Sequence, residues 1–442
     1  MSNRTYVEHD EEPLPAAGYR TYEVYQRERV AESSNLLAPR ELIGDEMLTA
    51  PHRLLTILRE HHPCYRDWVG NRFWITRYDD VTSVFVDDAN YESRSKRWFA
   101  GLADRNVTFD PARCDGFGRD LGAEVPVLWA QANRVDAHVE QIVERVIDDL
   151  VDEPDLASGF AARLPLELWG AVLDLPSGDL PEFSARYWRM QRAGGWDPRA
   201  QRDGNAAAME LARYLEPLLA ERRADPGDDL ISAAAGLELD GGPIEAVDIV
   251  ATIWEADHET LHGGLANMWY QLLTNPDQLE TVRDDRRLVK FAWLETLRHS
   301  PPVHSAARFT RHEVERFGRL LPAGALLHCS AAAANRDPRV FADPDAFVVE
   351  RTDLCQREPR GQYRADGLPS GIAFGLGRPS VHPAVPKDRP RSTYALVRDV
   401  AVTASRMLLD ARPDIRLAPG AAPVMRSLRL GEMYTCWRLP IT

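Results

Sequence analysis

The chain has 442 residues, with 53 Lys and Arg against 68 Asp and Glu, and its formal net charge is −15 at pH 7. This excess of negative charge disfavours binding to nucleic acids and to anionic membranes, because both attract basic surfaces. Hydrophobic residues make up 44% of the chain and charged residues 27%, which is the composition of a globular protein and not of a disordered one. We therefore expect a folded protein with neither a nucleic acid nor a membrane as a partner.

The cysteines and the N-terminal residues indicate the cellular compartment. Five cysteines are present and no two of them form a CxxC pair. An odd number without paired spacing argues against a disulfide framework and against a zinc site made of four thiolates. The first residues, MSNRTYVEHDEEPLP, contain no apolar stretch of the kind found in signal peptides. The sequence therefore predicts a soluble, cytoplasmic protein.

Residues 1–45 differ in composition from the rest of the chain. They are polar and rich in Glu, with aromatic side chains at Tyr6, Tyr19, Tyr22 and Tyr25. We interpret them as an N-terminal arm that docks on the body or on a partner, and a mobile tail is the alternative. Residues 46–442 contain no internal repeat, no low-complexity tract and no obvious linker, so they predict a single domain.

Hydrophobic periodicity predicts mostly helices with a small β region. Helices are expected at residues 52–62, 80–88, 131–152 and 286–299, a strand at 71–78, a hairpin at 314–330 turning around 322–324, and a late helix beginning near 391–392. The longest predicted helix runs from about 243 to 274, with Pro243 in its first turn and Asn275-Pro276 after its end. Its apolar residues cover much of its circumference, which is typical of a buried central helix.

Four short motifs follow one another at a characteristic spacing. Glu295 and Arg298 lie three residues apart on one helical face, a spacing that by itself predicts only an ion pair. The segment EADHET (255–260) precedes them on the long helix. ANRDPRVFADPDAF (334–347), Arg351 and AFGLGRPSV (373–381) follow them in this order.

This order resembles the cytochrome P-450 superfamily, from about residue 45 to the C-terminus. The resemblance implies the P-450 fold, mainly α with a small β region. It implies that Glu295, Arg298 and Arg351 form the structural Glu-Arg-Arg triad. It also implies that Glu259 and Thr260 occupy the positions of the acid and threonine that relay protons to bound oxygen, and that Arg308 occupies the position of an arginine that holds a haem propionate.

The haem-binding loop departs from the family pattern at its most important residue. The family reads F-x-x-G-x-x-x-C-x-G, and this chain retains Phe374, Gly375 and Gly377 but has Val381 where the thiolate cysteine should be. Valine has no donor atom for iron, and the thiolate is the ligand that promotes cleavage of the O–O bond. Around this loop, Ala130 stands where the family has a propionate-binding histidine, and Asp257 replaces a glycine. The sequence therefore predicts no haem, no catalytic residues and no monooxygenase activity.

Two histidine motifs offer alternatives. His382 follows the vacant position directly, and histidine ligates haem in other folds. His258-Glu259-Thr260-Leu261-His262 has the H-E-x-x-H pattern of zinc metalloproteases. No third ligand follows at the usual spacing, and the His-Glu-Thr part arises from the P-450 helix motif itself, so we expect no metal. Bulky side chains are expected to refill the space left by a haem, with Trp129, Trp254, His258 and Trp269 as candidates.

The missing thiolate also suggests a function. The sequence resembles cysteine-less P-450 homologues of actinobacterial antibiotic pathways, which bind and activate the glycosyltransferase that attaches a deoxysugar to a macrolide or anthracycline. This resemblance implies an auxiliary protein whose partner is a glycosyltransferase and which needs no cofactor. Two alternatives remain: a haem-free enzyme that reuses the substrate pocket, and a P-450 with substitute haem ligation. A small molecule in the former haem or substrate pocket is compatible with all three.

Overall fold

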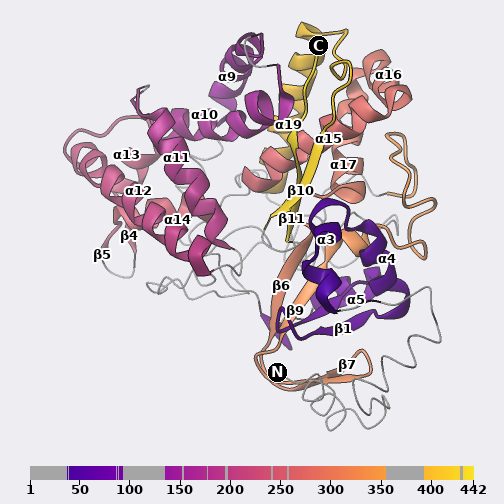
Figure 1. Ribbon diagram of the computed structural model, residues 1–442. Coiled ribbons are helices and arrows are strands. Elements are labelled where there is room, and N and C mark those ends of the chain that lie inside the picture. The colour runs from indigo at the N-terminus through magenta and orange to yellow at the C-terminus, as the bar shows by residue number, and fades with distance from the viewer. Residues whose placement is uncertain are drawn as a thin grey trace.

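The computed structural model describes Leu37 and residues 39–85, 87, 89–92, 135–151, 154–176, 178–194, 198–239, 242–255, 258–354, 393–428 and 432–442. The haem-loop residues Phe374, Gly375, Gly377 and Val381, together with Trp129, Ala130, Asp257 and His382, lie outside the described residues. Helices fill one part of the molecule and the main sheet lies in the other (Figure 1).

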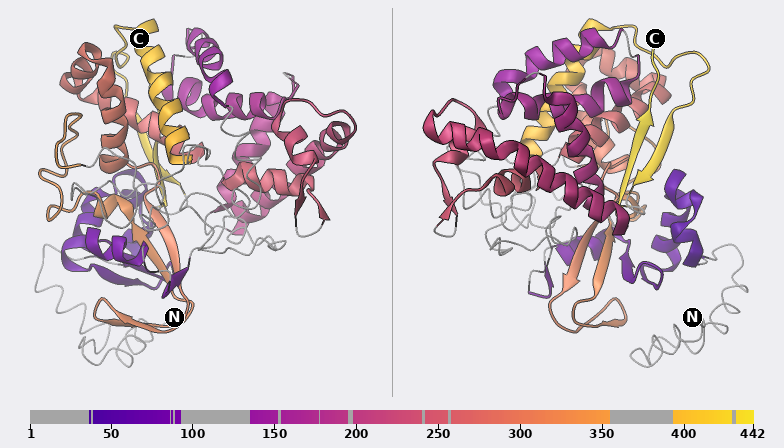
Figure 2. Two further views of the ribbon diagram at one scale, coloured as in Figure 1. Left: turned by 180° about the vertical axis from the view of Figure 1, so that it is seen from behind. Right: turned by 60° about the vertical axis from the view of Figure 1, so that its left-hand side comes forward.

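The helical part contains the largest apolar core of the described residues. Its helices are α9 (Asp136–Asp149), η3 (Leu156–Ala162), α10 (Arg163–Val172), α11 (Leu180–Gln191), η4 (Arg192–Gly194), α12 (Pro198–Ala224), α13 (Leu230–Ala235), α14 (Ala246–Glu255), α15 (His258–Thr274), α16 (Pro276–Asp284), η5 (Arg286–Leu288), α17 (Val289–His299) and α19 (Thr393–Ala411). Two views from other sides show α11 to α14 as a group that projects away from α15, α17 and α19 (Figure 2).

The sheet part combines segments that are far apart in the sequence. Its five strands run in the order β1 (Cys64–Asp67), β2 (Arg72–Ile75), β9 (Leu326–Ser330), β6 (Ser305–Thr310) and β3 (Tyr91–Glu92). Strands β2 and β9 are parallel, and the other three pairings are antiparallel. Short helices flank this sheet: η1 (Pro39–Ile43), α3 (Asp45–Thr49), α4 (His52–His61), α5 (Tyr78–Phe85) and α18 (Ala331–Ala334).

Three hairpins complete the described structure. They are β4 (Glu238–Leu239) with β5 (Gly242–Pro243), β7 (Val314–Arg316) with β8 (Arg319–Leu321), and β10 (Val424–Leu428) with β11 (Met433–Arg438). Strand β11 packs against α15 and η3, so it joins the C-terminal residues to the helical part. None of the described helices is both long enough and apolar enough to span a membrane.

Most of the elements predicted from periodicity are confirmed. Helices α4, α5 and α17, the strand β2 and the C-terminal helix α19 lie where the sequence placed them, and α9 falls within residues 131–152. The body begins earlier than the predicted arm boundary at residue 45, because Leu37 and Leu42 are fully buried and η1 is already formed.

The long central helix is predicted too long at its start. The structure describes two helices, α14 and α15, and the first begins at Ala246 rather than Pro243. Pro243 instead pairs with Glu238 in a short β-ladder. A local contact accompanies this start: the carboxylate of Asp248, the third helical residue, accepts a hydrogen bond from the Glu245 N–H just before the helix at 2.8 Å, as in one half of a capping box.

The predicted hairpin at 314–330 turns at a different place. The turn lies at Phe317 and Gly318, which have φ values of 57° and 69° and connect β7 to β8. Two consecutive positive φ values give the tight turn whose twist matches that of the strands. The next strand, β9, leaves this hairpin and pairs with β6 and β2. Pro322–Gly324 form a separate turn. The proline and glycine therefore correctly predicted a turn at this place, but it is not the turn of the hairpin.

Helix α15 packs unusually close to its neighbours through two adjacent glycines. A Cβ atom on Gly263 would lie 2.5 Å from Pro302 Cβ, and one on Gly264 would lie 2.4 Å from the Trp293 ring. Both distances are shorter than any real carbon–carbon contact, so only glycine allows this approach. Gly263 therefore lets α15 approach Pro302 and β11, and Gly264 lets it approach Trp293 of α17.

Substituting Gly264→Ala is expected to destabilise the protein by about 1–3 kcal/mol, because Trp293 is fully buried and cannot move away from the new methyl group without strain. Gly236→Ala is the matched control, since a Cβ there meets nothing within 4 Å. Urea unfolding of both variants measures the difference. Equal stabilities for the two variants would contradict the close packing of α15.

Candidate functional site

The best-defined polar centre in the described structure surrounds Glu295 on α17. Its carboxylate accepts hydrogen bonds from Arg298 at 2.7 and 2.8 Å, from Arg351 Nε at 3.2 Å and from the Val348 N–H at 3.0 Å. The Glu295 and Arg298 side chains are 1% and 0% exposed. The structure thus brings together the three residues of the predicted structural triad.

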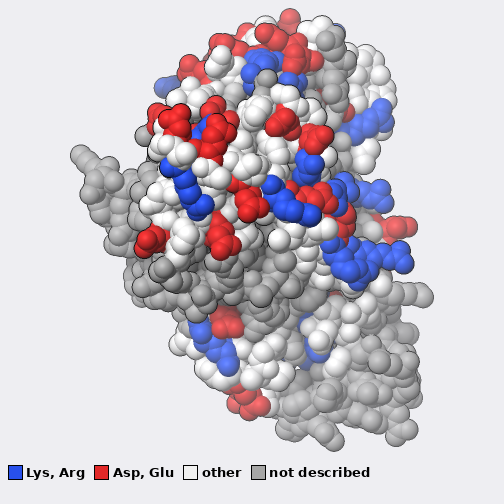
Figure 3. Space-filling view, turned by 90° about the vertical axis from the view of Figure 1, so that its left-hand side faces the viewer, with Lys and Arg blue, Asp and Glu red and all other residues white. Residues whose placement is uncertain are grey.

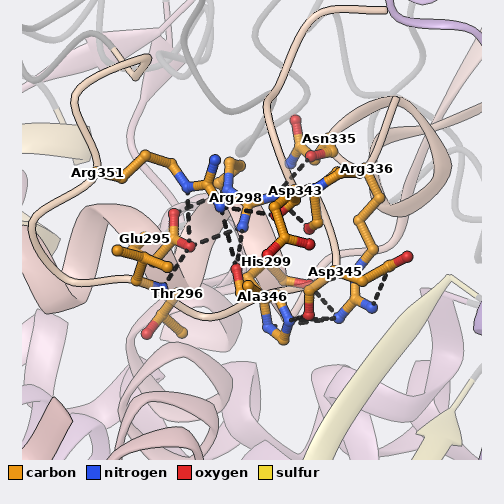
Figure 4. A network of polar contacts seen from close by, with 12 residues as sticks. Glu295, Thr296, Arg298, His299, Asn335, Arg336, Asp343, Asp345, Ala346 and Arg351 are labelled. Carbon is orange, nitrogen blue, oxygen red and sulfur yellow. Dashed lines mark hydrogen bonds and ion pairs between the residues drawn. The ribbon is translucent and has the colours of Figure 1, made fainter. Parts of the chain in front are cut away.

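Both arginines of this triad also hold backbone carbonyls of the segment 335–346. Arg298 donates to the carbonyls of Asn335, Pro344 and Ala346 at 2.8–3.0 Å. Arg351 donates to the carbonyls of Ala342, Asp343 and Ala346, which continues the same network (Figure 4). A guanidinium has five donors in a fixed plane, so it can join several carbonyls to one carboxylate. The triad therefore fixes an irregular segment onto α17.

A second arginine network lies beside the first and was not singled out from the sequence. Arg336 donates to the His299 backbone carbonyl at 2.8 and 3.0 Å and pairs with Asp345 at 3.1 Å. His299 Nδ1 lies 2.9 Å from Ser300 Oγ, and the other ring nitrogen lies 2.9 Å from the Asp345 carbonyl oxygen. Figure 4 shows both networks side by side. The ANRDP segment signalled this network, since Arg336 belongs to it.

Asn267 connects these networks to α15 and β11. It is fully buried, its amide donates to the carbonyls of Ser300 and Tyr434 at 2.9 Å, and its oxygen accepts from the Cys436 N–H at 2.9 Å. Gln271, one turn further along α15, donates to Ser300 Oγ at 2.9 Å. No pattern in the sequence identifies Asn267 in this role, because its partners lie 33 to 169 residues away.

Four histidines near these networks are held in the neutral form. Burial, with a smaller effect of the Arg336 charge, lowers the pKa of His304 to about 3. Burial and Arg336 keep the pKa of His52 well below 6.5. Burial and Arg336 also keep the pKa of His299 well below 6.5, and burial and Arg72 do the same for His328. Protonating any of them would place an additional charge next to an arginine in a dry environment.

The positions that would serve oxygen chemistry in the family lie at the start of α15. Thr260 is 1% exposed and its hydroxyl oxygen has no hydrogen-bond partner. The side chains of His258 and Glu259 are not among those that the structure describes. His262 lies between two aromatic rings, 5.0 Å from Trp188 and 5.2 Å from Trp437 by ring centroids. Among the described residues, no three His, Cys, Asp or Glu side chains form a metal site.

Arg308, the expected propionate-binding position, lies on β6. Its guanidinium carbon is 4.6 Å from the centre of the Phe85 ring, and Nη1 donates to the Ala307 carbonyl oxygen at 2.8 Å. Trp254 and Trp269, two of the residues expected to refill a haem cavity, are 1% and 0% exposed within the helical core. Their burial agrees with a packing function but does not place them in a former haem site.

The described cysteines do not fit the thiolate ligand that haem has in the family. Cys64, Cys329 and Cys436 are all buried, in β1, β9 and β11. Burial raises the pKa of Cys329 and of Cys436 to about 12, so both remain protonated thiols at neutral pH. A cysteine binds iron as its thiolate. The predicted ligand position, Val381, lies outside the described residues.

The surface over α11 and α12 carries charges of both signs. Arg189 pairs with Asp203 at 2.7 Å and with Glu210 at 2.8 Å. Arg186 pairs with Glu182 at 3.0 Å on the same surface. Acidic and basic side chains are interspersed on this side of the molecule, with no large patch of one sign among the residues drawn in colour (Figure 3). This part of the surface therefore has no character that would attract a polyanion.

Known proteins resemble this chain over most of its length. A cytochrome P450 family profile matches residues 196–364. Cytochrome P450 107B1 of Saccharopolyspora erythraea is 31% identical over 370 residues, which cover 78% of this chain and 82% of that protein. Cyclomarin C epoxidase CymV of Salinispora arenicola is 31% identical over 344 residues, 74% of this chain and 84% of that protein.

A solved structure agrees with these matches at the level of the fold. The structure reported for unusual cytochrome P450-like monooxygenases involved in microbial secondary metabolism has a TM-score of 0.69 at 22% identity, and covers 89% of this chain and 99% of that one. The mainly helical fold and the small sheet of this chain agree with the P450 fold of these proteins. This chain belongs to the cytochrome P450 family.

Proposed function

We propose that this chain is a haem-free member of its family that binds and activates a glycosyltransferase in the biosynthesis of a macrolide or anthracycline type antibiotic. The observation that carries the proposal is Val381 at the thiolate position. A P450 without its axial ligand cannot cleave O–O bonds by the family's chemistry. Cys64, Cys329 and Cys436 are buried in strands β1, β9 and β11, and none of them belongs to the loop that contains Val381.

The intact structural networks support retention of the fold for another purpose. The Glu295 carboxylate keeps its full set of partners, and Arg298 keeps its three backbone carbonyls. The family profile ends at residue 364, before the loop that contains Val381. Relatives such as CymV act on natural products, which favours the same metabolic setting for this chain. A scaffold preserved without its chemical centre is best suited to present a surface.

An activator of this kind works by binding the active conformation of its partner more tightly than the inactive one. A coupling free energy of about 1–3 kcal/mol would raise the active population about 5–150-fold. The interface would need to bury about 1,000 Å² or more to be specific. This function requires no chemistry at the former haem site. An enzymatic function would require reactive residues there.

The test is co-expression of the chain with a deoxysugar glycosyltransferase of macrolide or anthracycline biosynthesis, followed by measurement of sugar transfer and of soluble glycosyltransferase. We expect transfer to rise at least fivefold when this chain is present, and we expect purified protein to show no Soret absorption. Transfer that is unchanged by the chain would refute activation. A Soret band that disappears in His382→Ala would favour the alternative of substitute haem ligation.

A matched variant separates an activator from an oxygenase. Thr260→Ala alters the residue that would relay protons to oxygen, and it lies inside the molecule, where it is 1% exposed. Under the proposal this variant activates the glycosyltransferase as well as the natural sequence does. A loss of activation in a variant that remains folded would show that the former oxygen site has a catalytic function.

A further inference from the structure

Three aromatic rings from distant parts of the chain meet beside the β10–β11 hairpin, and we call them the histidine clasp. They are His52 at the start of α4, His304 just before β6, and Tyr434 on β11. The His304 ring centre lies 5.0 Å from that of Tyr434 and 6.0 Å from that of His52, and the His52 and Tyr434 ring centres are also 6.0 Å apart. The clasp is therefore a direct contact between an N-terminal helix and two later segments of the chain.

The histidine clasp lies where α3 and the start of α4 meet the β10–β11 hairpin. The Tyr434 hydroxyl donates to the Thr49 carbonyl at the end of α3, at 2.6 Å, and α3 also packs against β10 (Figure 1). The apolar side chains of these two helices, including Met47, Leu54 and Leu58, belong to a small cluster that is separate from the large core of the helical part. A segment with a small core of its own can open locally at a lower free energy than the whole protein.

The two imidazole rings of the clasp are not provided with hydrogen-bond partners for a charged form. Nδ1 of His52 and Nε2 of His304 are buried and have no hydrogen-bond partner among the described residues. An imidazolium has N–H donors on both ring nitrogens, so protonation would leave a buried donor without an acceptor. His52 is half-buried, whereas His304 is only 3% exposed. His52 is therefore the ring that can reach water with the smaller rearrangement.

The charges around His52 also disfavour its protonation. After burial, the largest effects on this ring come from Arg336, His304, His299 and Arg59, and all four disfavour the charged imidazole. His52 is the first residue of α4, where the positive end of the helix dipole opposes a cation. The carboxylates on the adjoining segments are already paired: Asp345 with Arg336, Glu60 with Arg59, and Glu46 with Arg53.

We propose that the histidine clasp is acid-sensitive: when His52 takes up a proton, α3 and the first turn of α4 are released from the β10–β11 hairpin. In the released state the ring is solvated and titrates with its ordinary pKa of 6.5, whereas burial keeps it neutral in the closed state. Acid therefore favours release, because only the released state takes up the proton. Release makes the face of β10 that α3 covers accessible. This inference does not depend on the proposed function.

The test is hydrogen exchange of the full chain at pH 7.5 and pH 5, expressed as protection factors so that the intrinsic pH dependence of exchange cancels. The reporters are the amides of Ala50 and Leu55, which donate to the carbonyls of Glu46 and Pro51. We expect their protection to fall about thirtyfold at pH 5, because one group with a pKa of 6.5 takes up a proton on release. The amides of α17 should stay more protected than these reporters at both pH values. Equal protection of α17 and the reporters would mean that the whole protein opens, which would overturn the proposal.

Two histidine variants assign the pH dependence to one ring. In His52→Gln the protection of Ala50 and Leu55 should change by less than about threefold between the two pH values, because the titrating group is gone. His61→Gln is the matched control, since His61 is exposed at the other end of the same helix. It should show the same fall as the natural sequence. A fall in His52→Gln as large as that in His61→Gln would refute the assignment to His52.

A third variant tests whether the clasp holds α3. Tyr434→Phe removes the hydrogen bond to the Thr49 carbonyl, and it should lower the protection of Ala50 about fivefold at pH 7.5 and at pH 5 alike. The further fall between the two pH values should remain, because His52 is still present. Protection of Ala50 that is unchanged in Tyr434→Phe would show that the clasp does not hold α3 in place.

Discussion

Substituting Glu295→Ala is expected to lower the free energy of unfolding by about 3–5 kcal/mol, because it leaves the buried Arg298 guanidinium without its carboxylate. Arg351 loses the same partner and keeps only its ion pair with Asp353 at 3.1 Å. Arg298 is fully buried and Arg351 is 7% exposed, so water cannot replace the lost partner without opening the structure. The Val348 N–H loses its acceptor as well. Guanidinium chloride unfolding at pH 7.5, followed by circular dichroism, measures the loss.

Glu280→Ala is the matched control for this prediction. Glu280 pairs with Arg283 at the same three-residue helical spacing, but its side chain is 61% exposed. Surface ion pairs contribute about 0–1 kcal/mol, because water screens them and the side chains lose entropy. A difference between the two variants therefore measures burial rather than the helical pair itself. If both cost the same, the Glu295 network is not the structural centre described above.

The protein is expected to lose about 4–7 kcal/mol of stability between pH 6.5 and pH 5, because four histidines are held in the neutral form. Each has a pKa in the folded state well below the value of 6.5 that it regains on unfolding. The unfolded chain therefore takes up protons that the folded chain does not, and acid favours unfolding. Each such group contributes a slope of about 1.4 kcal/mol per pH unit below its unfolded pKa.

The sign of this effect can be tested with single variants. The stability that these histidines provide is fully present above pH 6.5 and is lost as the pH falls toward their folded values. His304→Phe removes one titrating group of four and should reduce the slope between pH 6 and pH 5 by about one quarter, whatever it does to stability at pH 7.5. His312→Gln is the control, since His312 is exposed beside Asn90. Identical slopes in both variants would contradict a neutral, buried His304.

Local sequence patterns predicted the burial of α15 but not the start of the helix before it. Its apolar residues correctly indicated a buried helix, and Leu265, Met268 and Trp269 are at most 1% exposed. The start of α14 was placed three residues too early, because a proline fits a helical first turn and a short strand equally well. The observed start is accompanied by one hydrogen bond from the Glu245 N–H to the Asp248 side chain. Cap geometry of this kind is weakly encoded in hydrophobic periodicity.

The prediction that this chain binds no haem rests on residue chemistry alone. A side chain can bind iron only if it has a donor atom, and valine has none. The identity of Val381 therefore bears on haem binding without coordinates. Motif spacing also identified Glu295, Arg298 and Arg351 as one group, although Arg351 lies 56 residues from Glu295. The family resemblance carried that information, since a local pattern could not.

Other features depend on contacts that form only when the chain folds. Asn267 accepts a hydrogen bond from Cys436, which lies 169 residues away. The neutral state of His304 follows from burial beside Arg336. The histidine clasp combines His52, His304 and Tyr434 from three distant parts of the chain. Burial, proximity and shape are properties of the assembled structure, because they depend on which segments pack together. The sequence by itself determined the family, and tertiary structure decided where charge, exposed apolar surface and neutral histidines are placed.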